Sequence, residues 1–372
     1  MKAEVHVEFS EGQPGDRSYS IRIAPGGLAL LPALLSESKG AHRYAIITDS
    51  NVAPLYGEAL LHSIRSIAPS SDLFVFPAGE AHKNRASWVQ LSDEMLAAGH
   101  GRDSAVIALG GGVAGDLAGF VAAAYLRGLP LIQVPTSLLA MIDSSVGGKT
   151  GVDTPAGKNL IGAFHQPQLV VADVATLKTL PFEHVRAGLA EALKHGMITD
   201  AAYLREGVAN ANALLVLEPE AMVRLIERSV AIKAAVVGAD ERESGLRKTL
   251  NFGHTIGHAV EALSQFELLH GEAISIGMVV EARLGEKLGE TLPGTMEEVR
   301  AALERFGLPT AVPRGFDPLA VLELTRVDKK ARAGLVEYSL LKEIGVSSRG
   351  RGSYGVPVRD DLVLETIREL SA

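Results

Sequence analysis

Histidine and glutamate residues in the second half of the sequence have the types and the spacing of a metal site. His254 and His258 are four residues apart, so in a helix they lie on one face. His270 comes at a predicted helix start, and Glu191 lies upstream on another predicted helix, close to His195. One glutamate and two histidines are a set that catalytic zinc uses, with coordination positions left for substrate. The spacing does not decide which of the four histidines are ligands, and each alone is compatible with an ordinary solvated or capped side chain.

A glycine-rich segment in the first half has the position of a phosphate-binding turn. The strand predicted at 105–109 runs into Gly110-Gly-Gly-Val-Ala-Gly-Asp116, and an alanine-rich helix follows. Glycines at such a turn let backbone N–H groups approach a phosphate, and a helix N-terminus favours negative charge. Asp49 follows a second predicted strand, where a carboxylate can receive ribose hydroxyls, and Glu80 and Lys83 follow a third. These residues favour a nucleotide site, although a tight turn under a helix would also account for the glycines.

Basic residues recur at predicted turns of a chain that is acidic overall. Lys149, Lys158 and Arg247 lie beside or close to glycine, and Lys329 is followed by Lys330. Lysine and arginine at turns indicate recognition of a phosphate or a carboxylate, although each could also be a solvated surface residue.

Two further charged residues lie in apolar surroundings. Asp143 follows an apolar run and is predicted to be a buried, hydrogen-bonded carboxylate, a candidate for acid–base or hydroxyl contacts. Lys194 comes three residues after Glu191, so the two share a helix face.

Length and composition set the class of protein. The chain has 372 residues, and roughly 150 residues per domain predicts two domains. Lys and Arg number 36 against 44 Asp and Glu, a net charge of −8, which argues against nucleic acid or an anionic membrane as partner. There is no Cys, so a metal site must use histidines and carboxylates. With neither a hydrophobic leader nor a membrane-length apolar run, we expect a cytoplasmic protein.

The periodicity predicts how these residues are positioned. Short apolar runs at 44–48, 71–76, 105–109, 131–134 and 169–172 alternate with helical stretches, as in a parallel sheet with crossover helices. Residues 4–9 and 19–23 are predicted to form a hairpin ahead of this sheet. From Pro181 onward, amphipathic segments such as 211–237, 272–288 and 296–306 predict an all-helical second half. We therefore place the domains at 1–180 and 181–372.

The motifs together resemble the 3-dehydroquinate synthase family of the sugar-phosphate cyclase superfamily, from about residue 49 to about residue 345. The most specific stretches are 110–116, 135–151, 157–166 and 240–259. The resemblance implies an α/β N-terminal Rossmann-like NAD-binding domain, an all-α C-terminal metal- and substrate-binding domain, and an active site in the cleft between them.

The resemblance also implies roles for single residues. The metal ligands fall on Glu191, His254 and His270, with Zn2+ or Co2+ as the ion, and His258 then belongs to the substrate site. The NAD contacts fall on Asp49, Glu80, Lys83, Gly111, Gly112, Val113, Gly115, Asp116, Thr136, Ser137, Lys149, Lys158, Thr176 and Thr179. The substrate contacts fall on Asp143, Lys149, Lys158, Asn159, Lys194, Lys233, Arg247, Asn251, His258 and Lys330, with Arg127 reaching across the interface of a homodimer.

The reaction implied by the resemblance turns 3-deoxy-D-arabino-heptulosonate 7-phosphate into 3-dehydroquinate and phosphate, with NAD reduced and then reoxidised in each turnover. Two anionic groups on one small substrate would explain the basic residues. Other sugar-phosphate cyclases of the valiolone or inosose type, a metal-dependent polyol-phosphate dehydrogenase and a catalytically silent binding protein are the alternatives.

Three residues depart from the family pattern. His184 stands where glutamate is common, Ser137 where a second threonine is common, and Asp153 where asparagine is common. Ser137 keeps a hydroxyl, so we expect its NAD contact to survive.

Overall fold

The structure is a computed structural model that describes residues 1–9, 18–37, 40–265, 267–327, 331–332 and 335–371. It contains two compact units, residues 1–180 with 222–235 and residues 181–221 with 236–372. The chain passes from the first unit to the second between Leu180 and Pro181. The division predicted from sequence assigned residues 222–235 to the second domain, whereas in the structure they belong to the first unit. These residues lie within one long helix.

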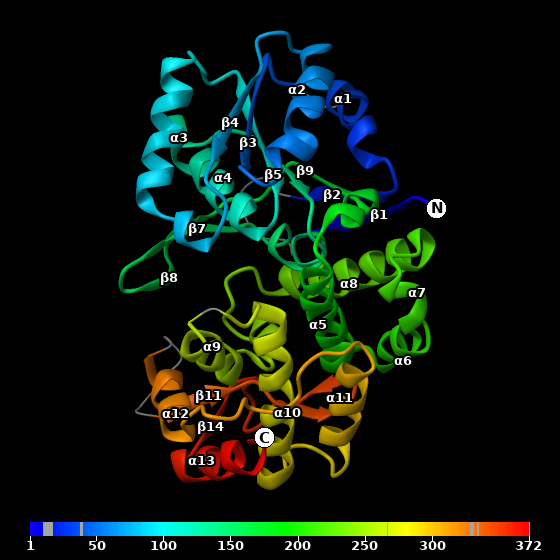
Figure 1. The fold of residues 1–372 in the computed structure, drawn as a ribbon, viewed down its shortest axis with the longest axis vertical. Helices are drawn as coiled ribbons and strands as arrows, with labels where there is room; N and C mark the ends of the chain where they lie inside the picture. Colours follow the sequence, from blue (N-terminus) through cyan, green and yellow to red (C-terminus); the bar gives the residue numbers. More distant parts are fainter. Residues whose placement is uncertain (10–17, 38–39, 266, 328–330, 333–334, 372) are drawn as a thin grey trace. The chain divides into compact units, whose positions relative to one another are not determined.

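The first unit is built on a sheet that contains seven strands among the described residues (Figure 1). In spatial order the strands are β1 (Ala3–Val7), β2 (Tyr19–Ala24), β9 (Leu169–Asp173), β6 (Leu131–Pro135), β5 (Ser104–Gly110), β3 (Arg43–Asp49) and β4 (Asp72–Phe76). β1 pairs with β2 in antiparallel fashion, and every other neighbouring pair is parallel. The predicted hairpin and parallel sheet are both confirmed.

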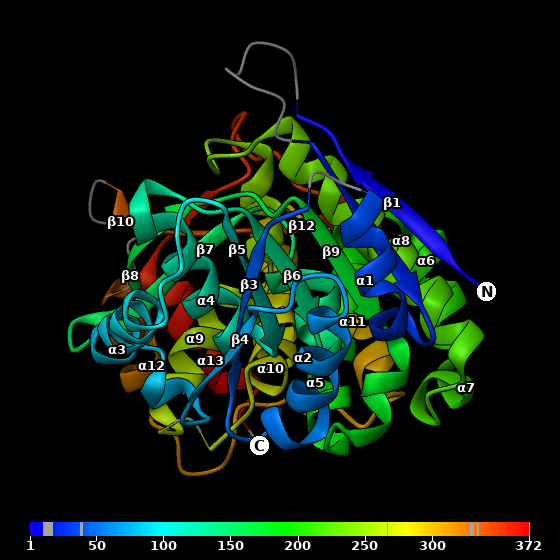
Figure 2. The same ribbon diagram turned by 90° about the horizontal axis from the view of Figure 1, so that it is seen from above.

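Helices cover both faces of this sheet, which explains why its strands are continuous apolar runs. On one face, residues such as Val106 pack against α3 (Arg85–Ala97) and α4 (Gly112–Ala124). On the other face, residues such as Ile107 pack against α1 (Gly27–Glu37) and α2 (Glu58–Arg65). Figure 2 shows the two pairs of helices on opposite sides of β3 and β5. Because neighbouring strands from β2 to β4 are parallel, their carboxyl ends lie at one edge of the sheet, where ligands of such sheets bind.

A second hairpin extends from the first unit and was not predicted from sequence. β7 (Lys149–Thr154) pairs with β8 (Gly157–Phe164) in antiparallel fashion. β7 packs on α4, whereas nearly all of β8 is exposed. Because β8 buries neither face, its sequence lacks the alternation by which a strand is recognised.

The second unit is largely helical, as predicted. Its helices are α5 (Phe182–Thr199), α6 (Ala201–Ala209), α7 (Ala211–Leu215), the ends of α8 (Pro219–Ala239), α9 (His254–Leu263), α10 (His270–Leu288), α11 (Thr295–Glu304), α12 (Pro318–Val327) and α13 (Asp360–Glu369). α10 is central and packs against α5, α9, α11 and α13. Apart from Glu281, the buried residues of α10 are apolar or small.

Two details of the predicted second half are wrong. It is not all-helical, because it also contains the short strands β10 (Ala331–Arg332), β11 (Leu335–Tyr338), β12 (Leu341–Glu343), β13 (Val346–Ser347) and β14 (Val356–Val358). Strands this short give too little periodicity to be seen in sequence. The helix predicted at 211–237 is interrupted, since Leu217 has a φ of +57° and Pro219 starts a new helix that Glu218 caps.

Glycines bring α9 and α10 into close backbone contact. A Cβ on Gly277 would overlap the carbonyl oxygen of Gly253 and come within 2.7 Å of the amide nitrogen of Gly257. The two helices can therefore approach this closely only while residue 277 has no side chain.

Among the described residues, no helix is long and apolar enough to cross a membrane.

We expect Gly277→Ala to destabilise the second unit by about 3 kcal/mol, because backbone atoms cannot move aside as a side chain can. Gly207→Ala is the matched control, since a Cβ there meets only Leu193 Cδ2, at 3.9 Å, and alanine favours a helix by about 1 kcal/mol. Urea unfolding of both variants measures the difference. Equal stabilities would contradict the packing described here.

Candidate active site

Three residues from three helices of the second unit converge on one point. Glu191 lies in the middle of α5, His254 is the first residue of α9 and His270 the first residue of α10. Glu191 is completely buried, and its Oε1 lies 3.4 Å from His254 Nε2 and 3.5 Å from His270 Nε2. The helices thus bring together residues that are far apart in the sequence.

These distances fit a divalent metal ion. Ligand atoms about 2.1 Å from a tetrahedral ion are separated by about 3.4 Å. His270 Nδ1 donates to Glu261 Oε2 at 3.0 Å, and His254 Nδ1 donates to the carbonyl of Phe252 at 3.2 Å. Both imidazoles therefore turn Nε2, the nitrogen that could act as a ligand, toward Glu191 Oε1. Glu191, His254 and His270 are the residues that could hold the ion.

The other histidines occupy different positions. His258 is exposed on α9 one turn after His254, and its ring centroid lies 5.2 Å from that of His254 and 5.7 Å from that of His270. The ring nitrogens of all three can also be grouped around one ion. His195 is completely buried on α5. His258 therefore remains an alternative ligand on geometry alone, and its predicted place in the substrate site stays a prediction.

A buried carboxylate on α10 fixes the start of α9. Glu281 is completely buried and accepts hydrogen bonds from the backbone N–H groups of Gly253, Thr255 and Ile256, at 2.7, 3.0 and 3.2 Å. These groups have no partner within their own helix, and a negative charge is favoured there. Glu281 thereby determines where His254 lies relative to α10.

The charges around Glu191 compensate its burial. Burial would raise the pKa of Glu191, but Lys194, which forms an ion pair with Oε2, and His270 hold it well below its usual range. Lys194 is itself 1% exposed. Burial would lower the pKa of His270, but its contacts with Glu191 and Glu261 outweigh burial and raise the pKa to about 9. Without a metal ion, the positive charge of protonated His270 thus takes the place of the cation that Glu191 and Glu261 would attract.

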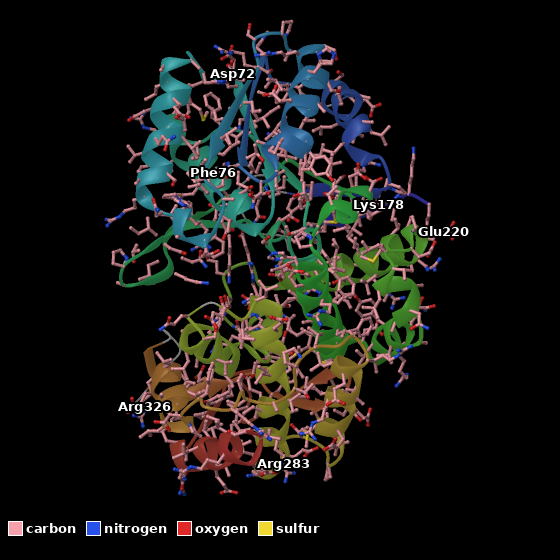
Figure 3. All side chains as sticks on the ribbon, viewed as in Figure 1. Asp72, Phe76, Lys178, Glu220, Arg283 and Arg326 are labelled. Atoms are coloured by element: carbon pink, nitrogen blue, oxygen red, sulfur yellow. The ribbon has the colours of Figure 1, made fainter. Side chains whose placement is uncertain are left out.

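In the first unit, the predicted nucleotide residues lie at the carboxyl edge of the parallel strands. Asp49 ends β3, and Gly111 and Gly112 follow β5 and begin α4. Connections leave β3 and β5 in opposite directions, so these two strands flank the point at which a dinucleotide binds in such sheets. Asp72 and Phe76 mark the two ends of β4 in Figure 3, and the loop with Glu80 starts after Phe76.

The two carboxylate oxygens of Asp49 face different groups. Its Oδ1 accepts from the N–H groups of Asn51 and Val52, so it caps the turn that follows β3. Its Oδ2 lies toward Gly110, where a Cβ would be 3.5 Å from it. One carboxylate oxygen therefore faces the glycine turn.

Lys83 is the centre of a cluster of charges at this edge. The side chain is 5% exposed, and its Nζ lies 2.9 Å from Glu80, 3.4 Å from Asp116 and 3.7 Å from Asp153. Burial opposes the charge of Lys83, but Asp116 and Glu80 raise its pKa above the usual value. Burial also raises the pKa of Asp116 to about 6, although Lys83 partly offsets this effect. Three carboxylates around one ammonium leave acceptor capacity for hydroxyl groups of a ligand.

The remaining predicted nucleotide residues fall at neighbouring strand ends. Thr136 and Ser137 follow β6, and a Cβ on Gly111 would lie 3.5 Å from Ser137 Oγ. Thr179 shares a 2.6 Å hydrogen bond with Tyr56. Thr176 is buried and donates to the carbonyl of Asp173 at 2.8 Å, so its hydroxyl is used within the fold. Val113 and Gly115 belong to the first turn of α4, where Gly115 contacts Gln133.

Predicted substrate residues of the first unit lie in three places. Lys233, on the part of α8 that belongs to this unit, donates to Asp143 Oδ1 and to its carbonyl, each at 2.5 Å. Lys149, Lys158 and Asn159 lie on the exposed hairpin of β7 and β8. Arg127 follows α4 and has a φ of +70°.

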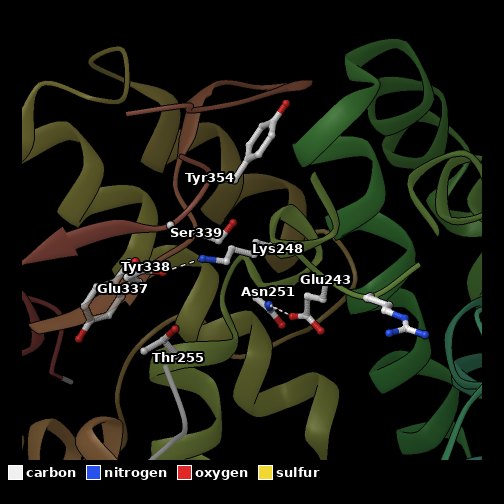
Figure 4. A pocket seen from close by; sticks show the side chains of 10 residues that line it. Glu243, Lys248, Asn251, Thr255, Glu337, Tyr338, Ser339 and Tyr354 are labelled. Atoms are coloured by element: carbon white, nitrogen blue, oxygen red, sulfur yellow. Dashed lines mark hydrogen bonds and ion pairs between the residues drawn. The ribbon is translucent and has the colours of Figure 1, made fainter. Parts of the chain in front are cut away.

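Predicted substrate residues of the second unit are Lys194, Arg247, Asn251 and His258. Arg247 is buried and donates to the carbonyl of Glu241 at 2.5 Å, and Asn251 donates to Glu243 at 2.6 Å. Asn251 lines a cavity of about 310 Å³ together with Lys248, which is paired with Glu337 at 2.8 Å (Figure 4). Lys330 lies outside the described residues.

Sequence reasoning missed the carboxylates that position these groups, although a signal for two of them exists. Glu261 comes seven residues after His254 on α9, and Glu281 comes eleven residues after His270 on α10. Both spacings place the carboxylate on the same helix face as the histidine. The other two, Glu243 and Asp153, lie in irregular segments or in a hairpin that was not predicted.

Comparisons with known proteins agree over most of the chain. Residues 73–187 match the family model "3-dehydroquinate synthase N-terminal", and residues 188–331 match "3-dehydroquinate synthase C-terminal". The chain is 48% identical over 326 residues to a 3-dehydroquinate synthase of Symbiobacterium thermophilum, covering 87% of this chain and 91% of that one. It is 47% identical to one of Acidithiobacillus ferrooxidans, covering 89% and 91%.

Solved structures of related cyclases are also similar. A 2-deoxy-scyllo-inosose synthase in complex with carbaglucose-6-phosphate, NAD+ and Co2+ has a TM-score of 0.91 and 27% identity, covering 99% of this chain and all of that one. A 2-epi-5-epi-valiolone synthase from Streptomyces hygroscopicus with NAD+ and Zn2+ has a TM-score of 0.84 and 28% identity, covering 97% and 99%.

Glu261→Gln is expected to weaken binding of Zn2+ about 10–100-fold, because His270 loses the carboxylate that orients it and makes it a better ligand. Glu286→Gln is the control, since Glu286 is a largely buried carboxylate of α10 that contacts Arg283 and the amides of Gly294 and Met296. Competition with a chromogenic chelator measures both affinities. Unchanged zinc affinity of Glu261→Gln would show that Glu261 does not support the site.

The metal-free protein should lose stability as the pH rises from 6.5 to about 9. A folded-state pKa above the ordinary value of 6.5 means that protonated His270 stabilises the fold fully below pH 6.5, and that this contribution disappears as the pH passes the folded pKa. Because the imidazole side chain is 30% exposed, we expect about 2 kcal/mol rather than the full shift. Urea unfolding of the metal-free protein and of His270→Asn across this range tests it. A stability difference that does not depend on pH would contradict the assignment.

Proposed function

The chain belongs to the 3-dehydroquinate synthase family, and we propose that it converts 3-deoxy-D-arabino-heptulosonate 7-phosphate to 3-dehydroquinate and phosphate, as a carbon–oxygen lyase acting on a sugar phosphate. The observation that carries this proposal is 45–48% identity to proteins of that name over about nine-tenths of both chains. The matched region contains the triad of Glu191, His254 and His270. The inosose and valiolone synthases, at 27% and 28% identity, are the alternative.

We propose NAD and a divalent ion, Zn2+ or Co2+, as cofactors. Structural relatives contain NAD+ with one or the other of these ions. When bound, the dinucleotide would accept and return a hydride, and the ion would polarise a substrate oxygen. Glu191, His254 and His270 would hold the ion, because their donor atoms have the separations that such an ion requires.

The first unit supplies the groups for the dinucleotide. Backbone N–H groups at Gly111 and Gly112, at the start of α4, suit the pyrophosphate. Asp49, and Glu80 with Lys83, offer acceptors and a donor at the ends of the neighbouring strands, where ribose hydroxyls and the nicotinamide amide can be held. This is the role proposed for the strand-edge residues as a group.

The substrate has a carboxylate and a phosphate, and the chain offers cations for both. Arg247 is buried, and Asn251 presents an amide beside the cavity of the second unit, which suits planar recognition of a carboxylate. Lys149, Lys158 and Asn159 of the first unit, and Lys194 and His258 of the second, are proposed to contact the phosphate and hydroxyl groups. Asp143, with Lys233 already paired to it, is a charged group that can exchange this partner for substrate.

We also propose that the protein works as a cytoplasmic homodimer, with Arg127 near the interface. Leu126 beside it is 37% exposed, and Leu160, Ile161 and Phe164 on β8 are 37%, 37% and 50% exposed. His165, which follows β8, donates to the carbonyl of Leu129 at 2.8 Å, so the two segments adjoin. Apolar side chains gathered on an exposed strand are typical of an interaction surface, which a second copy would cover.

One turnover assay tests this function. Metal-loaded protein, NAD and 3-deoxy-D-arabino-heptulosonate 7-phosphate are combined, and phosphate release and NADH absorbance are followed together. We expect phosphate release without accumulating NADH, because the hydride is returned in each turnover, and we expect EDTA to abolish it.

Variants and other outcomes make the assay decisive. His270→Ala should lose zinc and turnover together, whereas His62→Ala, on α2 of the first unit, should retain both. Phosphate release only from a hexose phosphate or from another heptulose phosphate would assign the chain to the other cyclases. Steady growth of NADH would identify a dehydrogenase instead.

A further inference from the structure

Asp153 joins two groups of residues to which separate ligands have been assigned. Its Oδ1 accepts from the backbone N–H of Asn159 at 2.8 Å and lies 3.7 Å from Lys83 Nζ. Its own N–H donates to the carbonyl of Lys83 at 2.7 Å. Asp153 therefore contacts both the loop after β4, proposed for the dinucleotide, and the tip of the β7–β8 hairpin, proposed for the substrate.

The hairpin tip has few other attachments. Within the single chain, β8 is almost wholly exposed from Gly157 to Phe164, so hydrophobic burial against the rest of the chain does not fix it. Asn159 has a φ of +55°, in the left-handed region that asparagine adopts more readily than most residues with a side chain. The hydrogen bond from Asn159 to Asp153 closes a ring of backbone around the turn, and Lys158 adds a longer contact of 3.7 Å to Glu80.

We propose that Asp153 is a positioning residue that links the affinity for the dinucleotide to the affinity for the sugar phosphate. A dinucleotide held by Glu80 and Lys83 fixes Lys83, and through Asp153 it fixes the hairpin tip. The sugar phosphate then meets Lys158 and Asn159 already ordered. This inference rests on the proposed function, because it takes from there the ligand of each group.

The linkage must be reciprocal. If the dinucleotide raises the affinity for the sugar phosphate by a given factor, the sugar phosphate raises the affinity for the dinucleotide by the same factor. The coupling can therefore be measured from the affinity for the dinucleotide, with and without the sugar phosphate, in equilibrium binding and without turnover.

NADH fluorescence provides the measurement on the metal-loaded protein. NADH cannot accept a hydride, so its complex with 3-deoxy-D-arabino-heptulosonate 7-phosphate does not react. The coupling ratio is the Kd of NADH without the sugar phosphate divided by its Kd with saturating sugar phosphate. We expect a ratio of about 5 or more in the unaltered protein.

Three variants separate coupling from stability. Asp153→Ala removes the side-chain contacts with Lys83 Nζ and Asn159, leaves the backbone hydrogen bond to the Lys83 carbonyl in place, and should bring the ratio to about 1. Asp153→Asn keeps an acceptor for Asn159 but loses the charge that attracts Lys83, and should lower the ratio at least about twofold. Asp72→Ala is the control, because Asp72 is paired with Arg43 and His100 at the amino end of β4, and should leave the ratio unchanged while lowering the Tm.

The outcomes are distinct. A ratio near 1 in the unaltered protein overturns the proposal, as does an unchanged ratio in Asp153→Asn together with Asp153→Ala. Should Asp153→Ala fail to fold, Asp153→Asn decides alone. If the turnover assay shows phosphate release but the coupling ratio of the Asp153 variants is unchanged, the linkage is rejected and the proposed function stands. An unaltered protein that binds no NADH would reject both the linkage and the proposed function.

Discussion

The second unit depends on the burial of one carboxylate. Glu191 is completely enclosed on α5, and a charge without water must be balanced by neighbouring charges or hydrogen bonds. Lys194 balances it from the same helix, and His254 and His270 approach it from the starts of two other helices. This requirement brings three helices to one point. It also explains why Glu191 favours a proton on His270 in the absence of metal and why its site suits the divalent ion proposed to bind there.

The two histidines are held in place by further carboxylates. Glu261 orients His270, and Glu281 binds the amides at the start of α9, which carries His254. The contact between α9 and α10 is close because Gly277 has no side chain. Donor atoms of a metal site must be placed within about 0.5 Å, and side chains achieve this only when a second layer of residues holds them. The packing of two helices is thus part of the proposed metal site.

Much of the fold followed from local patterns in the sequence. The parallel strands were visible because strands buried on both faces are continuous apolar runs, as in β5. The β7–β8 hairpin was not visible, because β8 buries neither face and so has no pattern to detect. The break between α7 and α8 was overlooked although Pro219 marks it, since the apolar period continues across the interruption. Asp153 had no recognisable role until the hairpin placed it between Lys83 and Asn159.

The sequence by itself determined the types of chemistry that this protein can perform and the elements that carry them. Residue types limited a metal site to histidines and carboxylates, and glycines after β5 predicted a nucleotide-binding turn at a strand end. Only the tertiary structure decided which groups meet. Glu191 is more than sixty residues from His254 in the chain, yet their atoms are 3.4 Å apart. Periodicity reports the face of one helix or strand, whereas the meeting of different elements depends on how their faces pack, which no local pattern contains.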